Sequence, residues 1–323
     1  MRRTLWAAGV VVALVAGGVV TWFVFRDSVA PFVAGDRCTA TVQGSSVRLT
    51  PEQAENAALM SAISVQRGLP ARAATIAIAT AYQESKLYNL DYGDRDSLGL
   101  FQQRPSQGWG TSRQVRDPVY AINAFYDALA RVEGFETLEV TVAAQEVQRS
   151  GYPQAYADHE ADARVLASAL TGQSWRAFHC TMTDEPDPAS SRLDGSGLTR
   201  RAAAVRDDLQ AAFGRQSLGG FAPGGVRDGH MEGSAHYDGR AVDVFFRPVD
   251  QESRNRGWAM AHYLVAQAAR LDIRTVIYDG RIWTAGWRSG DGWRPYTPDT
   301  SGESPETAAI LEHRDHVHVD VFE

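Results

Sequence analysis

Seven residues near the C-terminus alternate in a pattern that strongly limits their structure. In the segment from His316 to Phe322, valine occupies every second position, and His316, His318, Asp320 and Phe322 occupy the others. Strict alternation predicts a β-strand with the polar side chains on one face and the valines on the other. Two histidines on one strand face are therefore expected to line the same cleft.

A second segment, residues 234–243, places a histidine and an aspartate close to another predicted strand. His236 precedes a turn that contains Gly239, and Asp243 lies within an Ala-Val-Asp-Val-Phe-Phe run of β-branched and aromatic residues. A catalytic zinc ion takes three imidazole or carboxylate ligands and keeps a fourth position for water. A lone histidine is usually a hydrogen-bonded structural residue. Four of the eight histidines fall in these two C-terminal regions, however, which favours a Zn²⁺ site formed by His236, Asp243 and His318.

These residues carry a resemblance to a known family. The pattern Ser234-x-His236-x-x-Gly239-x-Ala241-x-Asp243, followed by His316-x-His318, resembles the zinc peptidase superfamily of D-Ala-D-Ala carboxypeptidases, related peptidoglycan endopeptidases and the hedgehog domain. The resemblance covers residues 198–323. It implies that His236, Asp243 and His318 bind zinc and that His316 steadies the oxyanion. It also implies that Arg227 holds a peptide carboxylate, although a surface arginine is an equally good interpretation.

The general base has two candidates. The carboxypeptidases carry a glutamate three residues before the last ligand, where this chain has Asp315, and a hedgehog-like arrangement points instead to Glu312. Either carboxylate could accept a proton from zinc-bound water, whose pKa the metal lowers to about 7. The alternative for both is a solvated loop carboxylate.

Composition limits the class of partner. The chain has 323 residues and a net charge of −7, and it contains no basic patch interleaved with aromatic residues. A nucleic-acid partner is therefore not expected. The length favours two globular domains with additional segments.

The N-terminus predicts a membrane anchor. An apolar run from Leu5 to Phe25 follows Arg2 and Arg3 and is long enough to cross a bilayer. We expect residues 1–27 to form a cytoplasmic tip and a single transmembrane helix, residues 28–49 a juxtamembrane segment, and the remainder to lie on the extracytoplasmic, cell-wall side of the membrane. A cleaved signal peptide is the alternative.

The two cysteines, Cys38 and Cys180, fit an oxidising compartment and are expected to pair. The alternative is two separate buried thiols.

Between the cysteines the pattern is mostly helical. Thr50 and Pro51 predict the start of a helix that runs to about Arg67, and a second, apolar helix is expected over residues 71–85. Glu84 lies at the end of this second helix. Partial desolvation raises the pKa of a carboxyl group, and a protonated carboxyl group is what a general acid for a glycosidic oxygen requires. A surface carboxylate at a helix end is the alternative.

A glycine-punctuated stretch follows Glu84. Glu84-Ser85, with Ser97-Leu-Gly-Leu-Phe-Gln102 behind it, resembles the lysozyme-like fold of soluble lytic transglycosylases. The resemblance covers residues 50–170. It implies that Glu84 is the single catalytic acid and that Gln102 contacts substrate in the cleft. Whether the sugar's own hydroxyl or a water molecule attacks stays open.

The polar stretch of residues 181–197 is rich in proline, serine and glycine, which predicts a linker. The expected fold is α+β and multidomain: a mainly α, lysozyme-like domain over residues 50–180 and an α+β domain with a central antiparallel sheet over residues 198–323. Together the resemblances imply a membrane-anchored peptidoglycan hydrolase that cuts glycan strands with the first domain and stem peptides with the second. The alternative is a wall-binding or scaffolding protein with a vestigial zinc domain.

Overall fold

Helices and two antiparallel sheets make up residues 35–323, the part of the chain that this computed structural model describes. The prediction of an α+β fold with antiparallel sheets is confirmed. Among these residues no helix is both long and apolar enough to cross a membrane. The predicted anchor, Leu5–Phe25, lies outside the described residues.

The first half of the described chain is mainly helical. Helix α2 begins where the sequence predicts, because the Thr50 side chain accepts a hydrogen bond from Gln53 N and the Gln53 side chain accepts one from Thr50 N. Helix α3 is buried along most of its length by alanine and isoleucine and ends at Ser85, directly after Glu84. The helices of this half are α2 (Pro51–Gln66), α3 (Ala71–Ser85), α4 (Ser112–Val115), α5 (Pro118–Leu129), α6 (Val140–Gln148) and α7 (Glu160–Leu170), with 3₁₀ turns at Pro105–Gln107 and Ala155–His159.

A three-stranded sheet closes this half. Strands β1 (Arg37–Val42) and β2 (Ser45–Leu49) form a hairpin, and β3 (Phe178–Thr181) pairs with the other edge of β1. Cys38 lies directly opposite Cys180 in this pairing, and the two form a disulfide. The predicted disulfide is confirmed. The hairpin occupies residues that the sequence assigned only to a juxtamembrane segment.

Removing the disulfide should destabilise the fold. The bond spans a sequence separation of 142 residues, for which the loss of loop entropy in the unfolded chain corresponds to about 4–5 kcal/mol. We expect the Cys38→Ser, Cys180→Ser double variant to show a free energy of unfolding lower by about this amount in urea titration under non-reducing conditions. Equal stability of variant and parent would show that the bond does not constrain the unfolded chain.

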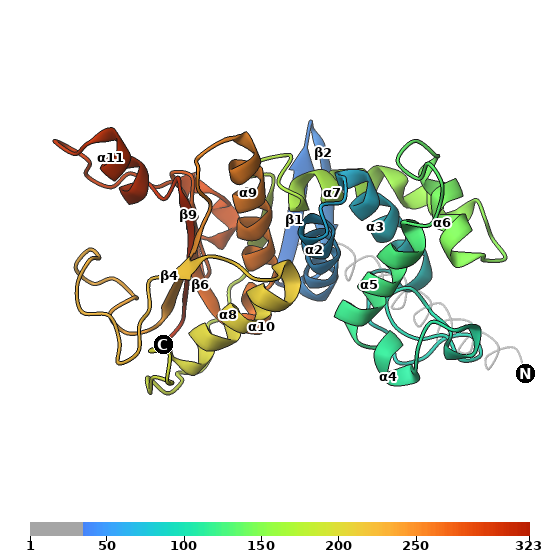
Figure 1. Ribbon diagram of the computed structural model, residues 1–323, viewed down its shortest axis with the longest axis horizontal. Helices are drawn as coiled ribbons and strands as arrows, with labels where there is room; N and C mark the ends of the chain where they lie inside the picture. The colour runs from blue at the N-terminus through green and yellow to red at the C-terminus, as the bar shows by residue number, and fades with distance from the viewer. Residues whose placement is uncertain (1–34) are drawn as a thin grey trace, which may run out of the picture. The chain divides into compact units, whose positions relative to one another are not determined.

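A six-stranded antiparallel sheet organises the second half, in the order β4-β5-β9-β6-β7-β8. Strands β5 and β9, which carry the predicted ligands Asp243 and His318, are neighbours near its centre. Helix α9 packs on β6 and β9 on one side and on α2 on the other (Figure 1). The elements are α8 (Arg200–Phe213), β4 (Leu218–Gly219), β5 (Ala241–Phe245), α9 (Gln251–Ala266), α10 (Ala268–Leu271), β6 (Ile273–Tyr278), β7 (Arg281–Thr284), β8 (Arg294–Pro295), α11 (Pro305–Leu311) and β9 (His316–Val321), with a 3₁₀ turn at Ser289–Asp291.

Helix α9 begins at Gln251 because of a cap: the Asp250 side chain accepts a hydrogen bond from Ser253 N.

The two halves share a buried interface. The indole N–H of Trp283 donates to Cys180 O at 3.0 Å, that of Trp293 donates to Phe178 O at 2.8 Å, and the ring of His262 contacts Ala169 O at 2.8 Å. Residues 37–323 accordingly form one compact unit. The domain boundary at residues 181–197 stays a prediction.

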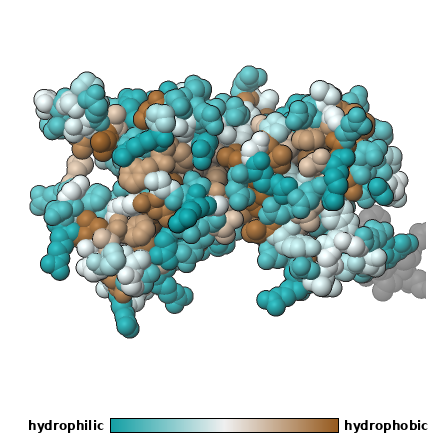
Figure 2. Space-filling model, in the orientation of Figure 1, coloured by the Kyte–Doolittle hydropathy of each residue, from teal (hydrophilic) through white to brown (hydrophobic). Residues whose placement is uncertain are grey.

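On the face shown in Figure 2, hydrophilic residues cover most of the surface.

Candidate metal centre and acid site

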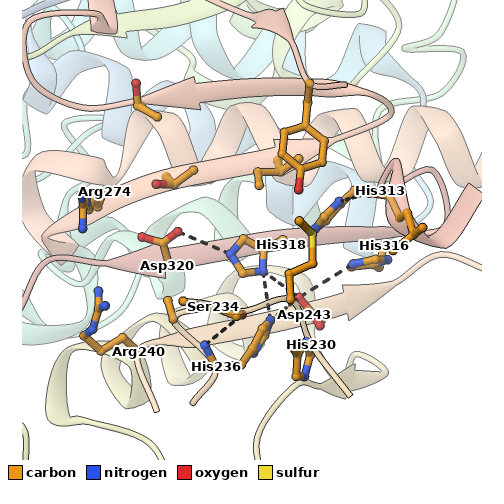
Figure 3. Close-up of a pocket in the computed structure, with 18 of the residues that line it drawn as sticks. His230, Ser234, His236, Arg240, Asp243, Arg274, His313, His316, His318 and Asp320 are labelled. Carbon is orange, nitrogen blue, oxygen red and sulfur yellow. Dashed lines mark hydrogen bonds and ion pairs between the residues drawn. The ribbon is translucent and has the colours of Figure 1, made fainter. Parts of the chain in front are cut away.

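A cavity of about 1000 Å³ opens over strands β5, β9 and β6. Its floor is formed by the polar face of β9, as the alternation of that strand predicts, and the loop of residues 229–236 forms one wall (Figure 3). Its chemically active lining residues are His230, His236, Asp243, His313, His316, His318 and Asp320, with Arg240, Arg247, Arg274 and Arg288.

Strand register brings two of the predicted ligands together. Asp243 on β5 lies directly opposite His318 on β9. His236 reaches the same point from the turn before β5. A side chain at residue 220 would collide with this group, because a Cβ there would lie 2.2 Å from His236 Cε1 and 2.9 Å from Asp243 Oδ2. Gly220, which has a φ of 77°, thus lets the backbone approach the cluster.

The three predicted ligand atoms form a nearly equilateral triangle. His236 Nε2 lies 3.1 Å from His318 Nδ1 and 3.2 Å from Asp243 Oδ1, and His318 Nδ1 lies 3.1 Å from Asp243 Oδ1. Zinc holds nitrogen and oxygen at about 2.0–2.1 Å, so two ligands of a regular tetrahedron lie about 3.3 Å apart. The observed spacing fits one small tetrahedral cation.

In both histidines, the far nitrogen, which is the ring nitrogen that points away from the triangle, contacts a hydrogen-bond acceptor that orients the ring. His236 Nδ1 donates to Gly220 O at 2.7 Å, and His318 Nε2 lies 3.4 Å from Asp320 Oδ2. A carbonyl and a carboxylate can only accept, so the far nitrogen of each ring carries a proton. The near nitrogen is the one that can offer a lone pair to a cation at the centre of the triangle once its own proton is released. This outer contact also makes an imidazole a stronger ligand.

The charges in the cluster favour a cation. Burial raises the pKa of Asp243, but hydrogen bonds from His236 and His318 outweigh burial and keep that pKa well below its usual range. Burial lowers the pKa of His318, while its contacts with Asp243 and Asp320 raise it to about 9. Without a metal the cluster therefore contains an ionised carboxylate and a protonated imidazole, and a bound cation would take the place of the imidazole proton that faces the centre of the triangle.

A fourth group, His230, belongs to the cluster and was missed by sequence reasoning. His230, His236 and Asp243 lie close enough together to hold a metal ion jointly. The rings of His230 and His236 stack with centroids 4.0 Å apart. His230 lies in an irregular loop without strand or helix periodicity, so no pattern linked it to β5 or β9. Its position in an Asp-Gly-His-Met stretch of that loop was the only available signal.

His316 lies beside the triangle. Its Nε2 is 4.0 Å from Asp243 Oδ1, and its Nδ1 contacts Asp315 Oδ1 at 2.7 Å. Asp315 also accepts a hydrogen bond from Arg247 Nε at 2.7 Å. Burial raises the pKa of Asp315, but the bonds from His316 and Arg247 lower it overall, so Asp315 stays ionised. The Asp315 carboxylate therefore lies behind His316 and fixes the orientation of its ring.

Two other predicted site residues lie elsewhere. Glu312 pairs with Arg314 and lines a separate, smaller pocket rather than the large cavity. Arg227 is exposed and is absent from the lining of the cavity. The structure thus brings together His236, Asp243, His316 and His318 but does not bring Glu312 or Arg227 to them.

Glu84 has the environment expected of a proton donor. It lies half-buried at the end of α3, where burial raises its pKa, and hydrogen bonds from Tyr156 and Gln148 offset part of this increase. The Tyr156 hydroxyl donates to Glu84 Oε1 at 2.8 Å. The next residue, Ser85, donates to Leu100 O at 2.7 Å and so ties the helix end to the Ser97–Gln102 stretch.

The amide of Gln102 braces the loop in which it lies. Its Nε2 donates to Tyr92 O at 3.2 Å and to Gly99 O at 3.3 Å. Gln102 has a φ of 47°, and its side chain packs against Gly93, where a Cβ would lie 2.0 Å from Gln102 Oε1. These bonds use the nitrogen of the amide and hold the stretch next to Glu84 in place.

The Tyr156→Phe variant tests the control of the Glu84 pKa. A general acid works in its protonated form, so activity is present below its pKa and is lost as the pH rises through it. The tyrosine hydrogen bond lowers this pKa. If Glu84 is the acid of a glycan-cleaving reaction, as the sequence resemblance implies, the variant should keep this activity to a higher pH than the parent does, measured as the alkaline limb of the pH–rate profile. An unmoved limb would mean that a group other than Glu84 controls it.

In the comparison with known proteins, a family model described as the VldE C-terminal domain matches residues 194–308, less than half of the chain. This match includes His236 and Asp243 and ends before β9. No curated protein matches the chain.

Proposed function

We propose that the chain is a peptidoglycan hydrolase with two activities: zinc-dependent cleavage of stem peptides in its C-terminal half and glycan-strand cleavage in its N-terminal half. The triangle of His236, Asp243 and His318, with sides of 3.1–3.2 Å beneath an open cavity, carries the proposal. Two imidazoles and one carboxylate are a ligand set that catalytic zinc sites use.

Zinc, when bound, would polarise a peptide carbonyl and lower the pKa of a bound water to about 7. The residues of the chain supply the remaining chemistry. His316 Nε2 faces the cluster, and Asp315 holds the ring from behind, so His316 is placed to exchange a proton with the reacting groups and to stabilise the oxyanion. Asp315 is in this account a positioning residue.

In the N-terminal half, Glu84 is the proposed acid. Burial raises its pKa and so favours the protonated form that can donate to a glycosidic oxygen. The proposed location is the cell-wall side of a membrane, with residues 1–27 as anchor. The disulfide supports an oxidising, extracytoplasmic environment for this part of the chain.

Digestion of purified sacculi tests both activities together. The purified protein, loaded with zinc, is incubated with sacculi, and the soluble products are analysed by mass spectrometry. We expect new glycan ends and new peptide termini. Glycan ends without peptide termini would refute the peptidase, and the reverse would refute the glycan-cleaving activity.

A wall-binding protein with an inactive zinc domain is the second candidate. One observation favours it: Asp315 is bound to Arg247 and His316, and Glu312 is bound to Arg314, so neither carboxylate is free to act as a base in the cavity. For this candidate, sacculi should retain the protein in a pull-down while no peptide termini appear.

A further inference from the structure

An exposed tryptophan lines the metal cavity. Among residues 35–323, Trp287 has the highest exposed fraction of the large hydrophobic side chains, 87%. A single apolar side chain in solvent is common and needs no ligand to explain it. Trp287, however, shares its cavity with His236, Asp243 and His318. A ligand that extends from the metal cluster along the cavity would therefore meet the indole ring.

The turn that carries Trp287 is held in place by the backbone at Met182, directly after β3. Gly286 N donates to Met182 O at 2.9 Å, and Met182 N donates to the buried hydroxyl of Ser289 at 2.8 Å. The guanidinium of Arg288 lies 5.4 Å from the centre of the Trp287 ring. The ring is thus exposed to solvent while its backbone is fixed, so a ligand can bind to it with little loss of loop entropy.

Strand register indicates how far Trp287 lies from the metal cluster. On β9, Asp320 follows the predicted ligand His318 by two residues and lies opposite Thr275 of β6. Thr275 in turn lies opposite Thr284, the last residue of β7, and Trp287 follows three residues later. Neighbouring strands are about 4.8 Å apart, so Thr284 lies about 10 Å from β9. Three to four residues of extended peptide span about 10–14 Å, which matches this separation.

The charged side chains at this end of the cavity have both signs. Arg274 lies at the end opposite His316 (Figure 3), and the Glu185 carboxylate lies close to Gly286, the residue before Trp287. The side chains of Glu185 and Arg274 make no hydrogen bond or ion pair with any other residue that the structure describes. A carboxylate accepts hydrogen bonds and a guanidinium donates them. The pair therefore suits a neutral ligand with hydroxyl and amide groups better than an ion of either sign.

We propose that Trp287 forms a sugar subsite, and that the metal cavity takes stem peptides that are still attached to the glycan strand. The C–H groups of a pyranose ring form an apolar face that packs on an aromatic ring, while its hydroxyl and acetamido groups stay free to bond to Glu185 and Arg274. The carboxyl group of the sugar that bears a stem peptide is part of the amide bond, so this sugar is uncharged. The subsite rests on the proposed peptidase function for the identity of its ligand.

Fluorine magnetic resonance of fluorotryptophan-labelled protein tests where the sugar binds. The label enters all eight tryptophans, and the Trp287 signal is identified by its absence from Trp287→Phe. The zinc-loaded protein carries His316→Gln, which prevents peptide turnover, and Glu84→Gln, which prevents glycan cleavage. We expect a disaccharide-pentapeptide to shift the Trp287 signal and the free pentapeptide to leave it unchanged.

Competition against a dye-labelled free pentapeptide measures affinity at the peptide site alone. We expect the disaccharide-pentapeptide to compete at least about tenfold more strongly than the free pentapeptide, because the sugar ring adds buried apolar area. Trp287→Ala should abolish this preference, and Trp287→Phe, which keeps a flat ring, should retain most of it. The control is Val249→Ala, which shortens an exposed apolar side chain outside the cavity lining and should retain the preference fully.

The outcomes separate the subsite from the peptidase. A Trp287 signal that both peptides shift alike would mean that a peptide side chain covers the ring, and it overturns the subsite, as does an unchanged preference in Trp287→Ala. Peptide cleavage by the protein with intact His316, without any response of the Trp287 signal, overturns the subsite alone. A sugar preference that depends on Trp287, without peptide cleavage, supports the subsite and refutes the peptidase. Unchanged melting temperatures of the variants exclude misfolding as the cause of lost binding.

Discussion

The His236→Ala variant should lose tightly bound zinc and, with it, stem-peptide cleavage. His236 supplies one corner of the triangle, and its removal leaves two ligand atoms, Asp243 Oδ1 and His318 Nδ1, 3.1 Å apart. Removing a residue that only hydrogen-bonds to a metal ligand weakens metal binding about 10–100-fold. Removing a ligand itself should therefore weaken zinc binding by more than this. Zinc content after dialysis against a weak chelator, and Kd from chelator competition, measure the effect.

His159→Gln serves as the matched control, because His159 lies in the helical half and contacts Gln83 rather than the cluster. Zinc affinity of this control should equal that of the parent. If His236→Ala kept the parent's zinc affinity, the metal would be held without His236, and the proposed ligand set would be wrong. Glycan cleavage should persist in His236→Ala, since Glu84 acts without metal.

The Glu84→Gln variant should lose glycan cleavage by about 10²–10⁴-fold, the usual contribution of a general acid. Glutamine preserves the shape of the side chain and can still accept the hydrogen bond from Tyr156, so the fold around α3 should be unchanged. Release of soluble glycan fragments from sacculi measures the rate, and peptide termini should still appear.

An exposed glutamate, Glu136, provides the control. Glu136→Gln should cleave glycan at the parental rate. Parental glycan cleavage by Glu84→Gln would remove Glu84 from the chemistry, whereas equal loss in both variants would indicate general damage to the protein.

Local signals made the helices and the central strands predictable. Thr50 and Pro51 mark the start of α2, and Asp117 caps α5 in the same manner, because side-chain oxygens that satisfy the first backbone N–H groups are readable in the sequence. The alternation of β9 likewise fixed which side chains share a face, and Asp243 and His318 are paired as neighbours across β5 and β9.

Non-local pairing was not predictable in the same way. The β1–β2 hairpin turns at Gln43 and Gly44, both with positive φ, and its short strands contain threonine and serine rather than a strong apolar pattern. Strand β3 joins them from residues 178–181, far along the chain. In the sequence, only the expected pairing of Cys38 with Cys180 indicated that β1 and β3 lie close together.

The surroundings of the candidate site were also beyond the sequence. His230 reaches the cluster from a loop, and Asp315 turns toward Arg247 and His316, because the positions of these side chains depend on tertiary contacts. The sequence motif predicts which residue types bind the metal, whereas the orientation of the neighbouring carboxylates depends on the three-dimensional structure.

X-ray absorption at the zinc K-edge of the loaded protein tests the ligand set most directly. We predict four-coordinate zinc with two imidazole nitrogens, from His236 and His318, and two oxygens, one of them from Asp243, and one imidazole fewer in the His318→Ala variant. A parent spectrum without imidazole scattering, or one that is unchanged by His318→Ala, would contradict the proposed centre.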